Sequence, residues 1–313
     1  MQKVQYITVI KDREGQRIDN YLLAHVGKIP KSLVYRWLRK GEVRVNKKRV
    51  KQTYRVVCDD IVRIPPVFLE PNTSEEKLKK LDFSYLEDFI LYEDKDFIVM
   101  NKPTGLAVHG GSGLDSGLIE RLRVLRPNEK KLELVHRLDR DTSGCILIAK
   151  KYSILTYFHE QLRERKVRKI YHALVSGVWP KSITKIDMPL KKFVPSSGER
   201  FVRVDQEGKA SLTTTRVLEI FSGCTLVQAS PHTGRTHQLR VHLQSVGHPI
   251  LGDRKYSRRE LDKPFMDKGL NRLFLHAYEL TFIKPGTDES VTIRAEYDAV
   301  LEKVIKRVSK TKV

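Results

Sequence analysis

Apolar residues follow two different periodicities along the chain, which predict that the core is built from both strands and helices. Residues 96–100 and 145–149 are unbroken apolar runs, short enough to be strands buried in a sheet, and residues 169–177 alternate like a strand with one exposed face. In residues 117–125 and 152–165, apolar side chains recur every three or four positions, as they do on one face of a helix.

The first 66 residues have a pattern of their own. A helix is expected over residues 31–40, because the segment follows Pro30 and is closed by Gly41. Residues 43–50 alternate like a strand that breaks into a basic turn. A polar, charged run then follows two prolines, which is typical of a linker. We therefore expect a small module at residues 12–66, a linker at residues 67–85 and a larger domain at residues 86–313.

The charge of the chain is strongly positive and unevenly distributed. Its 313 residues include 59 Lys and Arg against 38 Asp and Glu, a formal net charge of +21. Residues 1–66 hold 16 of these cations and 6 of the acids, so about half of the excess charge lies in about a fifth of the chain. Such a charge predicts a polyanionic partner, with nucleic acid first and an anionic membrane second.

Two further features of the sequence indicate the cellular compartment of the protein. No apolar run approaches the ~20 residues of a membrane-spanning helix, and the first residues lack the apolar core of a signal peptide. The three cysteines, Cys58, Cys145 and Cys224, are widely spaced and have apolar neighbours, which is typical of reduced thiols. We therefore expect a cytoplasmic protein that does not bind a membrane.

The densest polar segment is His136-Arg137-Leu138-Asp139-Arg140-Asp141-Thr142-Ser143-Gly144, and it leads straight into the apolar run 145–149. Carboxylates, guanidiniums, an imidazole and hydroxyls thus lie on a loop held against the core, an arrangement in which functional sites are commonly built. The alternative is a surface ion-pair cluster that caps the strand, because charge clusters usually have no other role. Asp141 and Arg140 fit that simpler description best.

A second candidate segment, residues 101–111, follows a buried strand with a Lys-Pro-Thr-Gly turn and then glycines. The spacing fits neither a P-loop nor a dinucleotide-binding fingerprint, so a tight turn is the alternative.

A third candidate segment covers residues 233–253, where Thr236 is placed to cap a helix. The histidines in and next to this segment suggest zinc, but no cysteine pair accompanies them and His242 fits the apolar face of the helix. The four histidines are His232, His237, His242 and His248.

Four segments, taken in order, resemble motifs of the pseudouridine synthases of the RluA type. They are Lys-Pro-x-Gly with Val-His at residues 102–109, His-Arg-Leu-Asp with Thr-Ser-Gly at 136–144, Lys-x-Tyr at 169–171 and Gly-Arg-Thr-His-Gln-Leu-Arg at 234–240. The resemblance implies an α+β fold whose synthase domain has a mixed, largely antiparallel sheet flanked by helices. It also implies isomerisation of uridines to pseudouridine in RNA, with 23S ribosomal RNA as the substrate.

The resemblance also implies roles for single residues. The aspartate of His-Arg-Leu-Asp is the catalytic carboxylate of the family, which falls here on Asp139. Arg240 would pair with Asp139 and keep it ionised, while Tyr171 would stack near the uracil and take or relay the C5 proton. Arg137 would fill the gap left by a base that leaves its stack. The side chains expected to bind the substrate are Arg137, His136, Thr142, Lys102, Arg235, His237 and Gln238.

The N-terminal module resembles the S4 RNA-binding domain, in which two short helices and a β-turn present basic side chains to folded RNA. A solvated basic face is the alternative for any single residue, but the whole set favours phosphate contacts. Without an aromatic platform, we expect recognition of RNA shape rather than base sequence. The expected RNA contacts are Arg17, Lys31, Ser32, Arg36, Arg39, Lys40, Arg44, Asn46, Lys47 and Lys48.

The implied reaction cuts a C–N glycosidic bond and rejoins the uracil through C5, so we expect no cofactor and no metal. We further expect a monomer. Two other classes of protein remain open. One is a ribosome-assembly factor that only binds RNA. The other is a nucleoside or RNA hydrolase with a carboxylate pair, which the single well-placed Asp139 argues against.

Overall fold

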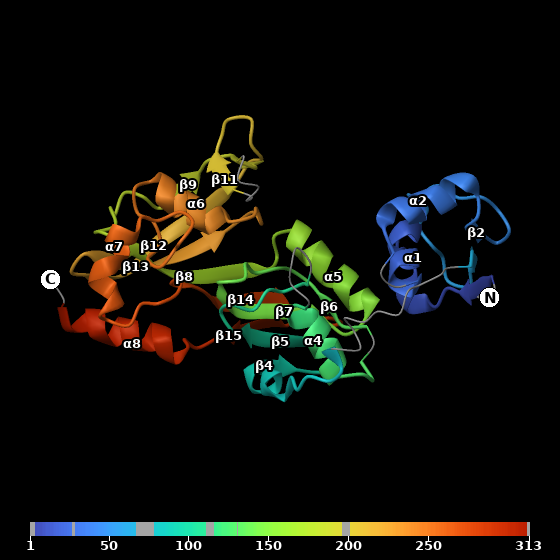
Figure 1. Ribbon diagram of the computed structural model, residues 1–313, viewed down its shortest axis with the longest axis horizontal. Coiled ribbons are helices and arrows are strands. Elements are labelled where there is room, and N and C mark those ends of the chain that lie inside the picture. The colour runs from blue at the N-terminus through green and yellow to red at the C-terminus, as the bar shows by residue number, and fades with distance from the viewer. Residues whose placement is uncertain are drawn as a thin grey trace. The chain divides into compact units, whose positions relative to one another are not determined.

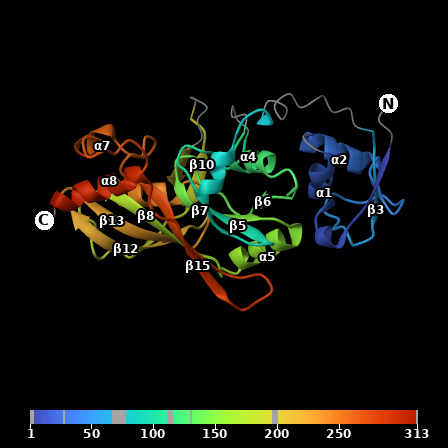
Figure 2. The ribbon, with the colours of Figure 1, turned by 90° about the horizontal axis from the view of Figure 1, so that it is seen from below.

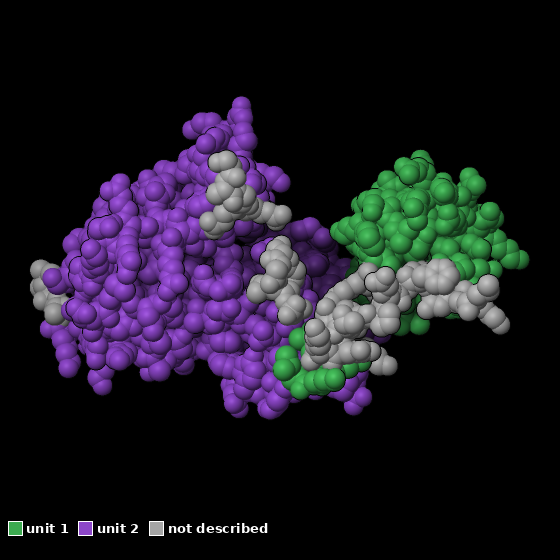
Figure 3. Space-filling model, in the orientation of Figure 1, with its two compact units in different colours: residues 1–81, 151–153 green, residues 82–150, 154–313 purple. Residues whose placement is uncertain are grey.

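The computed structural model describes residues 4–26, 29–66, 78–110, 116–129, 131–195 and 201–311. The chain forms two compact units, Met1–Leu81 with Lys151–Ser153 and Asp82–Lys150 with Ile154–Val313 (Figure 3). Each unit has a hydrophobic core of its own. Of the linker expected at residues 67–85, residues 67–77 lie outside the described part of the chain.

The N-terminal unit is a small antiparallel sheet that packs against two helices (Figure 1). Its strands follow the order β1-β3-β2. Val34, Trp37 and Leu38 of α2 enter the core, and the helix ends at Gly41, as predicted, with a φ of +72°. The elements are β1 (Gln5–Thr8), η1 (Lys11–Arg13), α1 (Ile18–Val26), α2 (Lys31–Lys40), β2 (Arg44–Val45) and β3 (Ile61–Ile64).

The strand expected over residues 43–50 is shorter than predicted, because the chain reverses within it. Asn46 and Lys47 have positive φ values of 48° and 66°. Val45 therefore pairs with Lys48 across a tight turn. The basic turn of the prediction is present, and it leaves only β2 as regular strand.

The larger unit is built on a ten-stranded sheet (Figures 1 and 2). Its strands follow the order β4-β5-β7-β14-β8-β13-β12-β9, with β6 beside β7 and β15 beside β14. Among the strands in the described ranges, β7 and β14 form the one parallel pair, so the expected mixed, largely antiparallel sheet is confirmed. The strands are β4 (Ile90–Glu93), β5 (Phe97–Lys102), β6 (Glu133–Leu134), β7 (Ser143–Ala149), β8 (Arg168–Ser176), β9 (Lys185–Asp187), β12 (Leu212–Phe221), β13 (Cys224–Pro231), β14 (Leu275–Ile283) and β15 (Ser290–Arg294), with a separate hairpin of β10 (Leu190–Phe193) and β11 (Phe201–Val204).

Helices pack against two parts of this sheet and give each part a core. Phe158 of α5 meets Phe97 and Phe282 edge-on, with ring centroids 5.4 and 5.3 Å away. Farther along the sheet, Leu239 and Leu243 of α6 pack with α8, β8 and β13. The helices are η2 (Ser84–Phe89), α4 (Leu118–Leu125), α5 (Tyr152–Arg163), α6 (Gln238–Ser245), α7 (Arg259–Met266), α8 (Ala299–Val308) and η3 (Ser309–Thr311).

The helices and strands predicted from apolar spacing are present, and their ends lie within a few residues of the predicted positions. Strands β5, β7 and β8 and helices α4 and α5 all lie where the periodicity placed them. In the part of the chain that is described, no helix combines the length and the apolar character that crossing a membrane requires.

Candidate active site

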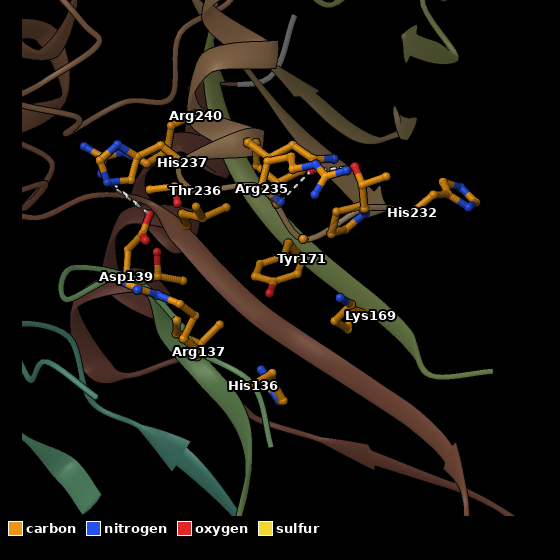
Figure 4. A pocket seen from close by; sticks show the side chains of 18 of the residues that line it. His136, Arg137, Asp139, Lys169, Tyr171, His232, Arg235, Thr236, His237 and Arg240 are labelled. Atoms are coloured by element: carbon orange, nitrogen blue, oxygen red, sulfur yellow. Dashed lines mark hydrogen bonds and ion pairs between the residues drawn. The ribbon is translucent and has the colours of Figure 1, made fainter. Parts of the chain in front are cut away.

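The central polar segment borders a cleft of about 670 Å³ in the larger unit. Asp139 reaches the cleft from the loop before β7, Tyr171 from β8 and Arg240 from α6 (Figure 4). Strands β7 and β8 both border β14, and α6 packs near β13. The fold therefore brings together the three residues for which the sequence predicts a catalytic role.

Asp139 faces two nitrogen-bearing side chains at the start of α6. Its Oδ2 lies 3.7 Å from Nη1 of Arg240 and 3.8 Å from Nε2 of His237. The Asp139 side chain is 19% exposed, so a ligand in the cleft can reach it. The expected pair of Asp139 and Arg240 is thus present at ion-pair distance.

The closer partner of Arg240 is Asp253. Nε and Nη2 of Arg240 donate to the two carboxylate oxygens of Asp253, each at 2.7 Å, and both side chains are buried. Burial opposes the charge of Arg240, but the hydrogen bonds and charge of Asp253, assisted by Asp139, raise its pKa. Arg240 is therefore a fixed cation that Asp253 holds and whose Nη1 faces Asp139.

The residues after Asp139 attach its loop to β14. The Thr142 N–H donates to the Asp139 carbonyl at 3.2 Å, and the Thr142 side chain is buried. Oγ of Ser143 accepts from Nη2 of Arg272 at 2.7 Å and lies 2.8 Å from Nδ1 of His276. Thr142, expected to bind substrate, thus lines the cleft while its backbone shapes the loop.

Gly144 brings β7 so close to β14 that no side chain fits between them. Its φ is +109°, and a Cβ there would lie 2.3 Å from the Ala277 carbonyl oxygen. We expect Gly144→Ala to destabilise the larger unit by about 3 kcal/mol and to displace the Asp139 loop. Trp179 fluorescence during urea unfolding, in a Trp37→Phe parent that retains it as the sole tryptophan, measures the loss. Gly234→Ala is the control, because its Cβ would meet nothing within 4 Å, and an equally small loss in both variants would contradict the prediction.

Lys102 lies behind the Asp139 loop rather than in the cleft. It is fully buried, and its Nζ donates to the carbonyl oxygens of Pro103 and Leu106 at 2.8 Å and of Arg140 at 3.0 Å. These bonds use the three N–H groups of an ammonium. The substrate contact expected of Lys102 is therefore corrected to a support of the loop from within. Burial is the main cause that lowers the pKa of Lys102 to about 7.

Gln238 also has an internal role. Its Oε1 accepts from Oγ1 of Thr233 at 2.7 Å and from the Arg235 N–H at 3.1 Å. Its Nε2 donates to the Leu212 carbonyl at 2.9 Å and to Oγ1 of Thr213 at 3.0 Å. Gln238 lines the cleft, as expected of a substrate-binding residue, but its polar groups are all bonded within the protein, where they support the loop before α6.

The start of α6 differs from the prediction. Thr236 is not its N-cap, because the helix begins at Gln238 and His237 occupies the capping position with a left-handed φ of 52°. The Gln238 side chain closes the preceding turn and so moves the start of the helix. The consequence is that the His237 imidazole faces Asp139.

Tyr171 and Arg137 present two different surfaces to the cleft. Figure 4 shows the Tyr171 ring between Lys169 and the Asp139 loop. Burial, and then Asp139, raise the pKa of Tyr171, so its side chain is a neutral phenol at neutral pH. Arg137 is exposed and lines both this cleft and an adjoining one of about 680 Å³. Arg235 is also exposed at the cleft, and its Nε donates to the Ala210 carbonyl at 3.2 Å.

His136 lines the cleft, but one of its nitrogens is used by the protein. Its Nε2 accepts from the Leu147 N–H at 3.2 Å. Burial lowers the pKa of His136 to about 3, so it is neutral at physiological pH. It can therefore offer the substrate a neutral ring rather than a charge.

Three histidines make the larger unit sensitive to acid. Burial lowers the pKa of His276 and His172 to about 4 and that of His136 to about 3. The unfolded chain binds these protons near pH 6.5, so their destabilising effect is absent above that pH. As the pH drops toward 4, each histidine removes up to about 1.4 kcal/mol of unfolding free energy per pH unit. His276→Gln keeps an acceptor and a donor, and we expect it to flatten this dependence in urea unfolding between about pH 7.5 and 5. An unchanged slope would show that His276 does not titrate as a buried neutral group.

The four histidines of the third candidate segment do not converge. His242 lies 2.9 Å from Oγ1 of Thr213 and 3.0 Å from the Met188 carbonyl, as a core histidine would. Nδ1 of His248 lies 2.8 Å from the Ser176 carbonyl. Within the described ranges, no three His, Cys, Asp or Glu side chains form a group that could hold a metal.

The residues of the N-terminal unit expected to bind RNA fall into two groups. Arg17 is half-buried and donates to both Asp19 oxygens, at 3.1 and 2.7 Å. Asn46 shapes the basic turn, because its Nδ2 donates to Asp60 at 2.7 Å and its Oδ1 accepts from the Ile61 N–H at 2.8 Å. Asn46 is nevertheless exposed, and so are the other expected contacts: Lys31, Ser32, Arg36, Arg39, Lys40, Arg44, Lys47 and Lys48.

Comparison with known proteins identifies the class. Residues 96–245, which include Asp139, Tyr171 and Arg240, match the family model described as RNA pseudouridylate synthase. Residues 16–62 match the S4 domain. The chain belongs to the RNA pseudouridylate synthase family and carries an S4 domain ahead of the synthase domain, as the motifs predicted.

Its relatives narrow the class further. Ribosomal large subunit pseudouridine synthase C of Pasteurella multocida (strain Pm70) is 52% identical over 305 residues, which cover 97% of this chain and 94% of the relative. The protein of the same name from Escherichia coli (strain K12) is 51% identical over 308 residues, covering 97% of both chains. Among solved structures, human RNA pseudouridylate synthase domain containing 4 is similar with a TM-score of 0.60 and 28% identity, over 76% of this chain and 97% of that one.

Sequence reasoning missed four residues that hold the site: Asp253, Tyr256, Arg272 and His276. For Asp253 a weak signal exists, since it is an acid that follows a glycine within a basic segment. Arg272 and His276 contact Ser143, which is 129 and 133 positions away, and no local pattern marks these two residues or Tyr256.

Proposed function

We propose that the protein isomerises specific uridines of 23S ribosomal RNA to pseudouridine, with Asp139 as the catalytic carboxylate. The observation that carries the proposal is the position of Asp139, accessible in the cleft and 3.7 Å from the fixed cation Arg240. The relatives named as ribosomal large subunit synthases support the choice of RNA.

The chemistry fits the groups that are present. Isomerisation breaks the bond between C1′ and N1 and forms a bond between C1′ and C5, while one proton leaves C5 and one is taken up at N1. A carboxylate assists either as the nucleophile or by stabilising the cationic sugar, and in both cases it must react as an anion. Arg240, held by Asp253, places a positive charge beside Asp139 in a partly buried site, where such a charge acts strongly.

The substrate must be unstacked before Asp139 can reach it. Arg137 is exposed and borders both cavities, so its guanidinium is suited to fill the space that the uracil leaves. Tyr171 would stack on the uracil and relay the C5 proton through its neutral hydroxyl. Its raised pKa argues against a phenolate base at neutral pH.

Pseudouridine mapping on unmodified 23S and 16S rRNA transcripts tests this function. We expect new pseudouridines at discrete positions of the 23S transcript and none in the 16S transcript. Tight binding of 23S rRNA without any product would favour the assembly factor, and release of free uracil would favour the hydrolase.

We further propose that the N-terminal unit binds RNA phosphates through its exposed cations. Replacing Arg36 and Arg39 with glutamine should weaken binding equally for different sequences and reduce the slope of log K against log salt by about 1 for each residue. Titrations at several salt concentrations measure this slope. Lys11→Gln is the control, because Lys11 is already paired with Glu14 at 2.5 Å, and an equal change in it would contradict a specific contact surface.

We also infer that one copy of the chain suffices and that it acts in the cytoplasm. Asp139, Tyr171 and Arg240 come from a single chain, which supports a monomer. Cys58, Cys145 and Cys224 are free thiols, which supports a reducing compartment.

A further inference from the structure

Tyr256 contacts both side chains that face Asp139, although it lies outside every motif recognised in the sequence. Its hydroxyl is 2.7 Å from Nδ1 of His237. The Cζ of Arg240 lies 5.0 Å from the centroid of its ring, at cation–π distance. One side chain thus supports two groups that approach Asp139 at 3.7 and 3.8 Å.

The hydrogen bonds of Tyr256 indicate which ring nitrogen of His237 bears the hydrogen. The hydroxyl accepts from the Val202 N–H at 3.0 Å, so its own hydrogen is available to a second partner. The Tyr256 oxygen could also accept a second bond, but Nε2 of His237 faces a carboxylate that can only accept, so we infer that Nδ1 is the unprotonated nitrogen and accepts from the Tyr256 hydroxyl. The remaining N–H of the neutral imidazole lies on Nε2, the nitrogen that faces Oδ2 of Asp139. Burial lowers the pKa of His237, against the opposing effect of Asp139, and so favours this neutral ring.

We propose that Tyr256 is a positioning residue of this active site, which fixes His237 as the Nε2–H tautomer facing Asp139 and supports the Arg240 guanidinium with its ring. The proposal rests on the proposed function, because its purpose is to hold two hydrogen-bond donors around a carboxylate that must react as an anion. The left-handed backbone of His237 agrees with it, since such a conformation persists only where the surroundings hold the residue in place.

The two contacts can be separated by two variants. Tyr256→Phe removes the hydroxyl and keeps the ring over Arg240, while Tyr256→Leu removes both. Long-range proton–nitrogen spectra of protein labelled with [¹⁵N]histidine report the tautomer, with His237→Gln used to assign the signal. We expect the wild-type His237 to be the Nε2–H tautomer and Tyr256→Phe to give a mixture of the two. Tyr157→Phe is the matched control, because its hydroxyl lies 3.4 Å from the Ile283 carbonyl and Tyr157 does not line the cleft.

Single-turnover kinetics on 23S rRNA provide the second readout. We expect Tyr256→Phe to lower the rate at saturating enzyme by about tenfold, and Tyr256→Leu by about a hundredfold, without a change in RNA affinity. Tyr157→Phe should change neither the rate nor the tautomer. A single tautomer or an unchanged rate in Tyr256→Phe overturns the proposal. If the wild type forms no pseudouridine, the proposed function fails, whereas the histidine spectrum still decides whether the hydrogen-bond chain exists.

Discussion

Asp139→Asn is expected to abolish pseudouridine formation while leaving RNA binding intact. An amide of the same shape cannot act as a nucleophile or stabilise a cationic sugar, so we expect the rate to fall by about 10⁴-fold or more. The fold should persist, because Asp253 neutralises Arg240 and the loop is held by the backbone of Asp139. Mapping of treated 23S rRNA measures product, and a binding titration of the same variant measures affinity.

The matched control lies two residues away. Asp141 is exposed and pairs with the exposed Arg140 at 3.7 Å, the loop ion pair that the sequence predicts. Asp141→Asn changes the same charge in the same loop, and we expect it to keep most of the activity. Substantial product from Asp139→Asn, or equal inactivation by Asp141→Asn, would remove Asp139 from the catalytic role.

Asp253→Asn is expected to cause the largest loss of stability among single charge changes in the site. The Asp253 side chain is 1% exposed. Its Oδ1 also accepts from the N–H groups of Lys255 and Tyr256, at 2.9 and 3.1 Å. Removing its charge leaves the buried Arg240 guanidinium without its main counter-charge, at a cost of about 3 kcal/mol. Urea unfolding followed by Trp179 fluorescence measures the loss.

Asp187→Asn provides the comparison with an exposed pair. Asp187 lies 3.1 Å from Lys185, and both side chains are more than half exposed. Such exposed pairs contribute little to stability, so we expect Asp187→Asn to change the free energy of unfolding by less than about 0.5 kcal/mol.

Asp253→Asn should also lower activity, because the Arg240 guanidinium, no longer held by Asp253, moves onto Asp139. A stability loss no larger than that of Asp187→Asn would mean that Asp253 does not hold Arg240.

The sequence predicts best those elements whose formation depends on the pattern of neighbouring residues. Strands β5 and β7 are predicted by short unbroken apolar runs, which are typical of buried strands, and β8 is predicted by its alternation of apolar and polar residues. The catalytic candidates Asp139, Tyr171 and Arg240 depend on a family resemblance, and the fold brings all three to one cleft.

The features that the sequence does not predict depend on which way a side chain points and on hydrogen-bond partners that are distant in the sequence. The internal hydrogen bonds of Lys102 and Gln238 are not predictable, because a polar side chain at a motif position can bond to the protein itself as well as to a ligand. Their hydrogen bonds to Arg140 and Leu212 join segments far apart in the chain. His276 and Ser143 are 133 positions apart, and only the pairing of β14 with β7 makes them neighbours. No window of local sequence contains such information.

The parallel pairing of β7 with β14 also sets when the site can form during synthesis. The N-terminal unit is built almost entirely from contacts within its first 64 residues, so it can fold soon after it leaves the ribosome. The Asp139 loop, in contrast, lacks Arg272, His276 and Ala277 until the ribosome has translated beyond residue 277. An unfinished chain would therefore present an RNA-binding module before it possesses an ordered Asp139 loop, and the ability to modify RNA would arise only near the end of translation.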